Sequence, residues 1–254
     1  MSKYPKPTNP KANPKLAVCT DKLPKALSPS RAKDFTQCPR MFYEKTIVKS
    51  IVWENTEATT KGTLVHHALE KLFDHERTER TADVAVTYVR PHWDSLKNRK
   101  DYAQLASIGE KKLEAMLSEA EEMVVEYFSI EDPKKFDPVA REDWIKTKLG
   151  AVSLNGVIDR LDSWEVDGET KYAISDYKTG KLPRDGYEAE AFFAMRVYAA
   201  GIRESKGITV DRVRLIHTRH GKEGVLSLAI TDEMVDETIA EYEPLKDLLL
   251  LADL

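Results

Sequence analysis

Two acidic residues and a lysine lie in strand-like stretches near the middle of the chain. Asp159 falls in GVIDRLD, and Asp176 and Lys178 fall in AISDYKTGK. Side chains alternate across a strand, so Asp176 and Lys178 share one face and Tyr177 points to the other. If the two stretches pair, Asp159 and Asp176 converge, and a divalent cation would relieve their repulsion. A lysine beside such an ion can stabilise charge on a phosphate, so the pattern predicts phosphodiester hydrolysis assisted by Mg²⁺ or Mn²⁺.

A histidine on a helix could complete this site. The stretch TTKGTLVHHALEKLFDHE has apolar residues at helical spacing, which predicts an amphipathic helix. His66 and His67 both border the apolar stripe, and helical geometry does not choose between them. Each feature alone has a simpler interpretation, because an Asp-x-Lys is usually a solvated pair and such histidines are usually structural. A histidine that joins both acids and the lysine makes a metal site.

The elements that must position these residues change in type along the chain. We expect a short helix after Ser28 or Ser30, three longer helices, three strands, a helix, a second hairpin and a final helix from Thr231 or Asp232. Asp167 and Gly168 form a hairpin signal between the second and third strands. The three longer helices cover 59–76, 81–97 and 104–129, the strands cover 141–149, 151–166 and 170–179, the next helix covers 187–207, and the second hairpin covers 210–231. This order predicts one α/β domain with a mixed central sheet and helices on both faces.

Composition limits the class of protein. The chain has 254 residues, and its longest apolar run, LLLLA, is far shorter than the ~20 residues of a membrane span. The N-terminus has no apolar signal-peptide region, and two cysteines do not suit a secreted disulfide scaffold. We therefore expect a cytoplasmic protein that is not inserted in a membrane.

Charge is unevenly distributed. Residues 1–49 hold eleven basic and three acidic side chains, a net charge of +8, which leaves −12 for the rest of a chain whose total is −4. Residues 1–25, rich in Lys, Pro and Asn, are predicted to be a flexible tail. Two interpretations of the basic arm stay open: a phosphate-binding edge and a solubilising tail.

The sequence resembles the RecB-like branch of the PD-(D/E)xK nuclease superfamily, most closely the CRISPR-associated and phage-encoded RecB-like exonucleases. The resemblance spans about residues 27–200 and keeps the order of five motifs: LSPSRAKDFTQCPRMFYEK, GTLVH, GVIDRLD, ISDYKTGK and MRVYA. It implies a restriction-endonuclease-like core with a helical insertion. The nuclease domain would cover 26–254, with its helical part at about 60–130 and its catalytic sheet core at about 135–230.

The resemblance also assigns roles. GTLVH selects His66 over His67, so that His66, Asp159, Asp176 and the backbone carbonyl of Tyr177 would bind Mg²⁺ or Mn²⁺. Lys178 would be the catalytic lysine. The implied substrate is DNA, with exonuclease action on single strands or ends.

The roles of Tyr198, Arg196 and Glu142 are less firmly assigned. Tyr198 and Arg196 would hold the DNA backbone, but Ala194 stands where the family has a glutamine. Glu142, on the strand before Asp159, either supports the site or is an ordinary surface acid, which is the simpler interpretation.

Cys38 raises the question of an iron–sulfur cluster. It matches the first of four cluster cysteines in many relatives, but no cysteine follows it, so this chain is not expected to hold a cluster. Cys38 is then an orphan ligand, if the chain stops short of a C-terminal cysteine segment within its last predicted helix, or a buried free thiol.

Two functions remain in competition. The first is a metal-dependent deoxyribonuclease that works with a recombination, replication or CRISPR-adaptation protein. The second is a catalytically inactive nuclease-fold module that binds DNA or a protein partner. The complete set of His66, Asp159, Asp176 and Lys178 favours the enzyme, while Ala194 keeps the second hypothesis open.

Overall fold

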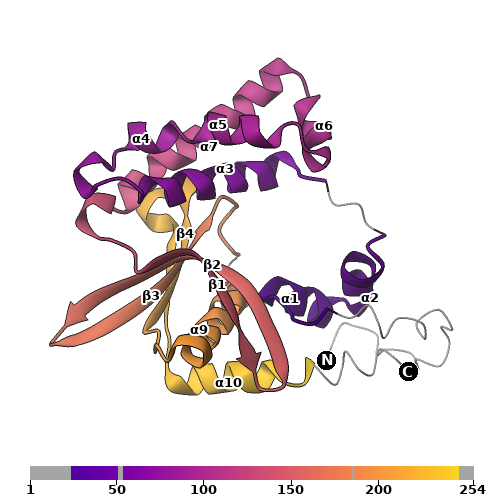
Figure 1. Cartoon of the computed structure of the whole chain (residues 1–254), viewed down its shortest axis with the longest axis vertical. Helices are drawn as coiled ribbons and strands as arrows, with labels where there is room; N and C mark the ends of the chain where they lie inside the picture. Colours follow the sequence, from indigo (N-terminus) through magenta and orange to yellow (C-terminus); the bar gives the residue numbers. More distant parts are fainter. Residues whose placement is uncertain (1–23, 51–53, 185, 246–254) are drawn as a thin grey trace.

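A mixed sheet forms the centre of the protein (Figure 1). The computed structural model describes residues 24–50, 54–184 and 186–245. In this part of the chain the sheet has five strands in the order β1-β2-β3-β4-β5. Its strands are β1 (Ala140–Leu149), β2 (Val152–Val166), β3 (Glu169–Lys178), β4 (Arg212–His217) and β5 (Val225–Ala229). Only β3 and β4 pair in parallel, so the mixed sheet expected from the sequence is confirmed.

A tight hairpin connects β2 and β3, as the sequence predicts. Val166 pairs with Glu169 across a two-residue loop of Asp167 and Gly168. Both loop residues have positive φ, 53° and 84°, which is the conformation that Asp-Gly hairpin turns adopt. This turn fixes the register that brings the GVIDRLD and AISDYKTGK stretches side by side.

One face of the sheet packs against α1 (Pro29–Gln37), α9 (Phe193–Lys206) and α10 (Asp232–Tyr242) (Figure 1). The Ser28 hydroxyl caps α1 by accepting the N–H of Arg31, and α9 ends at Gly207 in the left-handed conformation. α9 lies close to β1 and β2, because a Cβ on Gly201 would come within 2.6 Å of Leu154. The core on this face includes Phe35, Ile145, Leu154, Ile158, Ile174, Val197 and Val213.

The other face carries a layer of helices (Figure 1). Its members are α3 (Glu57–Leu72), α4 (Ala82–Val86), α5 (Val89–Leu96), α6 (Ala103–Ala106) and α7 (Glu110–Ile130). The buried residues of this helical layer include Leu64, Leu69, Trp93, Met123 and Val124, and they pack with Tyr177 and Ile216 from the sheet. Helices on both faces are therefore confirmed.

Three of the predicted helices are interrupted. The stretch 187–207 divides at Phe192 into α8 (Glu188–Ala191) and α9. The stretch 81–97 divides into α4 and α5, because Pro91 cannot donate a backbone hydrogen bond and fits only in the first turn of a helix. The stretch 104–129 divides into α6 and α7 at Gly109, whose φ of 94° is incompatible with a continuous helix. The breaks in 81–97 and 104–129 arise at residues whose backbone chemistry overrides an apolar pattern.

Shorter elements connect these layers. They are α2 (Pro39–Phe42), η3 (Tyr43–Val48), η4 (Arg77–Glu79), η5 (Lys100–Tyr102), η6 (Pro133–Lys135), α8 (Glu188–Ala191) and η7 (Thr218–Gly224). Most of the predicted flexible tail and the last nine residues of the chain lie outside the described residues. Within the described ranges, no helix combines the length and the apolar character that crossing a bilayer requires.

Candidate active site

β2 and β3 separate at the acidic residues. The last backbone pair between them joins Arg160 and Ser175. Asp159 is the next residue of β2 towards its N-terminus, and Tyr177 lies two residues beyond Ser175 on β3. The backbone N–H of Tyr177 donates to Oδ2 of Asp159 at 2.8 Å, so a side chain takes the place of a strand partner. Beyond this point the free edge of β2 pairs instead with Leu27, whose N–H donates to the carbonyl of Ser153 at 2.8 Å. The divergence opens space for side chains between two neighbouring strands.

His66 of α3 closes one side of this opening. Its Nδ1 lies 3.3 Å from Oδ2 of Asp159, and its Nε2 lies 2.8 Å from the carbonyl oxygen of Tyr177. Since both ring nitrogens face oxygen acceptors, these contacts favour the doubly protonated ring in the metal-free protein, and His66 would have to lose a proton to bind a cation. Burial lowers the pKa of His66, but the Asp159 carboxylate outweighs burial and raises the pKa to about 9. His67 points away and stacks on His92, so the structure distinguishes the two histidines.

Asp176 and Lys178 form an ion pair at the end of β3. Asp176 is largely buried, and burial together with the Asp159 charge raises the pKa of its carboxyl, against the opposing effect of Lys178. Lys178 is half-exposed. Burial lowers the pKa of its ammonium group, and the charge of Asp176 overcomes that effect and raises it. The lysine is therefore a charged donor that neutralises a carboxylate while it remains within reach of solvent.

Glu142 of β1 joins the group. It is opposite Asp159, where the β1–β2 ladder is interrupted between the Arg141–Arg160 and Asp143–Ile158 pairs, and its φ is 45°. The site desolvates its carboxyl, and this effect and the Asp159 charge raise its pKa. Glu142 is exposed, as an ordinary surface acid would be, yet it lies within reach of His66 and Asp159, so its support of the site stays a prediction. The register of the hairpin, counted outward from the Leu149–Val152 pair, could have shown that Glu142 faces Asp159.

The donor set suits a hard divalent cation. His66, Glu142 and Asp159 each offer one ligand atom, and these atoms all lie within 4.8 Å of one another. Asp176 is close enough to interact electrostatically with both Asp159 and His66. Carboxylate oxygens with one imidazole nitrogen are ligands that Mg²⁺ and Mn²⁺ accept.

Tyr198 and Arg196 point in different directions. Tyr198 packs against β2, where a Cβ on Gly156 would lie 2.6 Å from its Cε1. Burial and the charges of Asp176 and Asp159 raise the pKa of Tyr198 to about 12, so its hydroxyl remains protonated close to the carboxylates. Nη2 of Arg196 is 3.5 Å from Glu241 of α10, and its side chain lines a hollow beside α1. Glu142, Asp159 and Asp176 interact electrostatically and form a carboxylate cluster. The structure brings Tyr198 to this cluster but does not bring Arg196 there.

A buried arginine supports the site from behind. Arg160 is 1% exposed, and its Nη1 donates to the hydroxyl of Tyr177 at 2.6 Å and to that of Tyr127 at 3.1 Å. It also forms ion pairs at 2.9 Å with Glu131, which follows α7, and with Asp162 of β2. The role of Arg160 does not follow from the sequence pattern, because its partners at 127 and 131 are distant in sequence.

A pocket adjoins the carboxylate cluster between α3, α5 and β1. Its volume is about 570 Å³. His66 and Glu142 line this pocket, and both also belong to the group of three possible metal ligands. The rest of the wall comes from Thr59, Gly62, Thr63, His67, Glu70 and His92.

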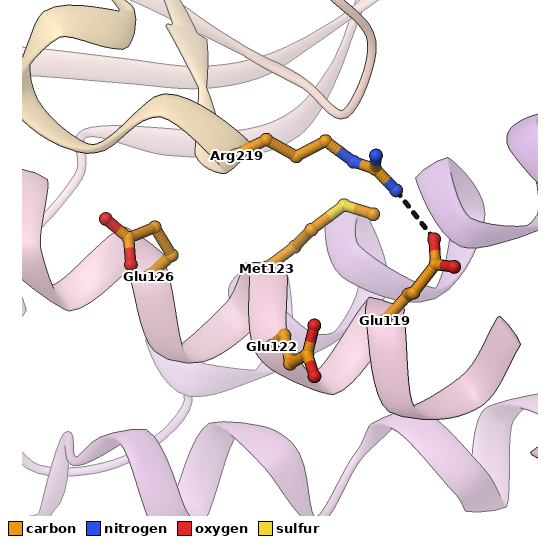
Figure 2. Close-up of a pocket in the computed structure, with 5 residues that line it drawn as sticks. All are labelled: Glu119, Glu122, Met123, Glu126 and Arg219. Atoms are coloured by element: carbon orange, nitrogen blue, oxygen red, sulfur yellow. Dashed lines mark hydrogen bonds and ion pairs between the residues drawn. The ribbon is translucent and has the colours of Figure 1, made fainter. Parts of the chain in front are cut away.

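A second hollow lies between α7 and η7 (Figure 2). Glu119, Glu122 and Glu126 make it acidic, and Nη2 of Arg219 donates to Glu119 at 2.8 Å. Nζ of Lys61 donates to the same carboxylate at 2.6 Å. Glu119 therefore pairs with two cations that come from different elements.

The chain neighbours of these two cations contact the end of β3 or the residue that follows it. A Cβ on Gly62, the neighbour of Lys61, would lie 3.3 Å from Oγ1 of Thr179. Thr218, the neighbour of Arg219, donates to the carbonyl of Lys178 at 3.4 Å.

Cys38 is an exposed free thiol at the start of α2, which contradicts its interpretation as a buried thiol.

Comparisons with known proteins identify the family and the fold. The family model of the PD-(D/E)XK nuclease superfamily matches residues 26–248. The chain is similar to one of the subunits of the ATP-dependent helicase/deoxyribonuclease of Carboxydothermus hydrogenoformans, with 29% identity over 181 residues. That match covers 62% of this chain and 16% of the relative, so the chain spans a small part of the relative's length.

A solved structure shares the fold. It is a candidate exonuclease from Eubacterium rectale, with a TM-score of 0.57 and 16% sequence identity. The superposition covers 90% of this chain and 81% of the other. With the family match over most of the chain and the carboxylates, histidine and lysine gathered where β2 and β3 diverge, the protein belongs to the PD-(D/E)XK nuclease superfamily.

Proposed function

We propose that the protein is a divalent-metal-dependent deoxyribonuclease that hydrolyses phosphodiester bonds, acting as an exonuclease on single-stranded DNA or DNA ends. The observation that carries this proposal is the convergence of His66, Asp159 and the Asp176–Lys178 pair where two strands diverge. Nuclease membership supports phosphodiester hydrolysis, and the name of the bacterial relative supports DNA as the substrate.

The proposed metal ligands are His66, Asp159, Asp176 and the Tyr177 carbonyl, with Glu142 as an additional ligand. A bound Mg²⁺ or Mn²⁺ would polarise a phosphoryl oxygen and lower the pKa of a water molecule. Asp159 has a second task, because it accepts the N–H of Tyr177 and so fixes the backbone from which Asp176 and Lys178 project.

Lys178 is the proposed catalytic lysine. Its ammonium group is protonated and half-exposed, so it can exchange Asp176 for a phosphate oxygen and stabilise the negative charge that develops there. Tyr198 is protonated and close to the carboxylates, and we assign it a hydrogen bond to the DNA backbone. Arg196 would contact the DNA at a more distant phosphate, beside α1.

The test compares wild type, Lys178→Ala and Lys171→Ala on end-labelled single- and double-stranded DNA with Mg²⁺, Mn²⁺ or EDTA. Lys171 is a matched control, since it lies on β3 but pairs with Glu169 and Asp211 at the opposite end of the strand. We expect metal-dependent cutting by wild type and Lys171→Ala and a loss of about 100-fold or more in Lys178→Ala. The product ladder distinguishes exonuclease from endonuclease action. Equal cutting by all three proteins would contradict the assignment of Lys178.

The second candidate is an inactive nuclease-fold module that binds DNA or a protein partner. Ala194 favours it, because the glutamine typical of this position in related nucleases is absent. DNA binding that persists in EDTA, without cutting under any metal, would support the module and contradict the enzyme. As partners of an active enzyme we propose DNA and a protein of recombination, replication or CRISPR adaptation.

A further inference from the structure

We propose that the pocket between α3 and α5 binds a nucleobase of the DNA strand next to the scissile phosphate, by stacking it on the His67–His92 pair. The inference rests on the proposed function and deepens it. It assigns to this site a substrate with an unpaired, unstacked base at the cutting position, which means a single-stranded or frayed end.

The position of the pocket carries the first step. Its wall includes His66 and Glu142, two of the three side chains in the metal-sized donor group. A phosphodiester held at that group carries a nucleoside on each side, so the base of a flanking nucleotide can reach the pocket. With a volume of about 570 Å³, the pocket is large enough for a small organic ligand.

The stacked histidines carry the second step. The rings of His67 and His92 have centroids 3.7 Å apart and an interplanar angle of 13°. Tyr88 meets the His67 ring edge-on at 6.3 Å, and the Tyr88 hydroxyl is 2.7 Å from Nε2 of His75. The pair is therefore held in place by aromatic neighbours, as a base-stacking surface requires.

Other roles for the pair fit less well. Buried structural histidines normally satisfy their ring nitrogens, but in the described part of the chain no ring nitrogen of His67 or His92 hydrogen-bonds to another protein group. Both rings are half-buried and line an open pocket. Among the described residues, neither belongs to a group of three metal-binding side chains. Flat rings at the wall of a pocket beside a phosphate-cutting site suit a base better than an ion.

The test uses single-stranded oligonucleotides that carry 2-aminopurine at each terminal position in turn. Binding is measured in EDTA, which prevents cutting, and stacking is read as fluorescence quenching. The proteins are wild type, His92→Ala, His92→Phe and the exposed-histidine control His220→Ala. We expect quenching at one position with wild type and His220→Ala, loss of quenching with His92→Ala, and recovery with His92→Phe, whose ring can still stack.

A matched set of oligonucleotides has an abasic site at the quenched position. Loss of a base–aromatic stack should weaken binding of normal DNA by His92→Ala about 5- to 100-fold, and the abasic DNA should bind wild type and His92→Ala equally. An equal loss on both DNAs, or no change in quenching, would overturn the inference. If wild type cuts DNA with metal while His92→Ala behaves like wild type, only the inference fails. If wild type neither binds nor cuts DNA, the proposed function fails with it.

Discussion

At the scale of the residue, the site holds two carboxylates in a configuration that is costly without a cation. Asp176 is buried next to Asp159, and one lysine neutralises it. A carboxyl whose pKa is raised by folding is ionised at pH 7 at the expense of stability. This cost diminishes as the pH falls through the folded-state pKa towards the ordinary value of 3.8. The ionised carboxylate of Asp176 therefore lowers the stability of the metal-free protein.

Asp176→Asn should therefore stabilise the metal-free protein at pH 7, by about 1 kcal/mol or a rise of about 2–4 °C in Tm. The gain should shrink at pH 4, where the wild-type carboxyl takes up its proton. Added Mn²⁺ should raise the Tm of wild type more than that of the variant. Thermal melts with and without EDTA measure all three effects. Asp94→Asn, which removes an exposed partner of Lys97, is the control and should leave the response to Mn²⁺ unchanged.

At the scale of the element, Arg160 links the sheet to the helical layer. Its guanidinium joins Tyr177 of β3, Tyr127 of α7 and Glu131, which follows α7. Removal of one partner from a buried charged network leaves the others uncompensated, so Arg160→Ala should cost about 3–5 kcal/mol in the free energy of unfolding. Urea denaturation measures this loss. Arg212→Ala, at an exposed arginine of β4, should cost less than about 1 kcal/mol, and similar losses in both variants would contradict the special role of Arg160.

The contact between α9 and β2 gives a second prediction at this scale. A Cβ at position 156 would lie 2.6 Å from Cε1 and 2.8 Å from the hydroxyl of Tyr198. Gly156→Ala should push Tyr198 aside, cost about 1–3 kcal/mol in unfolding free energy and weaken DNA binding. The double variant Gly156→Ala/Tyr198→Ala should regain stability but not DNA binding. If the double variant loses the sum of both single losses in stability, then the two residues do not compete for space.

The hairpins explain how much of the site could be predicted. Asp167 and Gly168 specify a local turn, and strand alternation then places Asp159, Asp176 and Lys178, so these residues follow from short-range rules. Glu142 and Arg160 depend on an interrupted ladder and on partners distant in sequence, which periodicity does not contain. The breaks at Pro91 and Gly109 were visible as residues but were outweighed by the apolar pattern. The sequence pattern therefore does not predict contacts between residues distant in the chain, or helix breaks that depend on a single proline or glycine.

At the scale of the whole molecule, a chain with a net charge of −4 must bind a polyanion through local positive charge. Lys61 and Arg219 provide such charge, but both are paired with Glu119. Figure 2 shows the pairing of Arg219. The partner that they would exchange for a phosphate is an exposed carboxylate on α7. The Arg219–Glu119 pair is exposed on both sides, and exposed ion pairs are weak, so a strand of DNA can displace it; the Lys61 side chain is largely buried.

Glu119→Gln should consequently tighten DNA binding about 2- to 10-fold at low salt and steepen its dependence on salt concentration, since two more cations become available to phosphates. Fluorescence anisotropy over a series of salt concentrations measures both quantities. Glu114→Gln removes an equal charge from the same helix, where the partner is Arg90. An equal gain in both variants would mean that overall charge, and not the pairing with Lys61 and Arg219, controls the affinity.

The divergence of β2 and β3 also creates a reporter inside the site. The amide proton of Tyr177 is protected from solvent exchange by the carboxylate of Asp159 and not by a neighbouring backbone carbonyl. Its exchange rate with deuterium therefore depends on where that carboxylate points. A cation that recruits Asp159 would change the protection of this one amide, while Val166 and Glu169, paired at the far end of the same hairpin, would keep theirs. A single backbone proton can thus record the loading of the site without any DNA being cut.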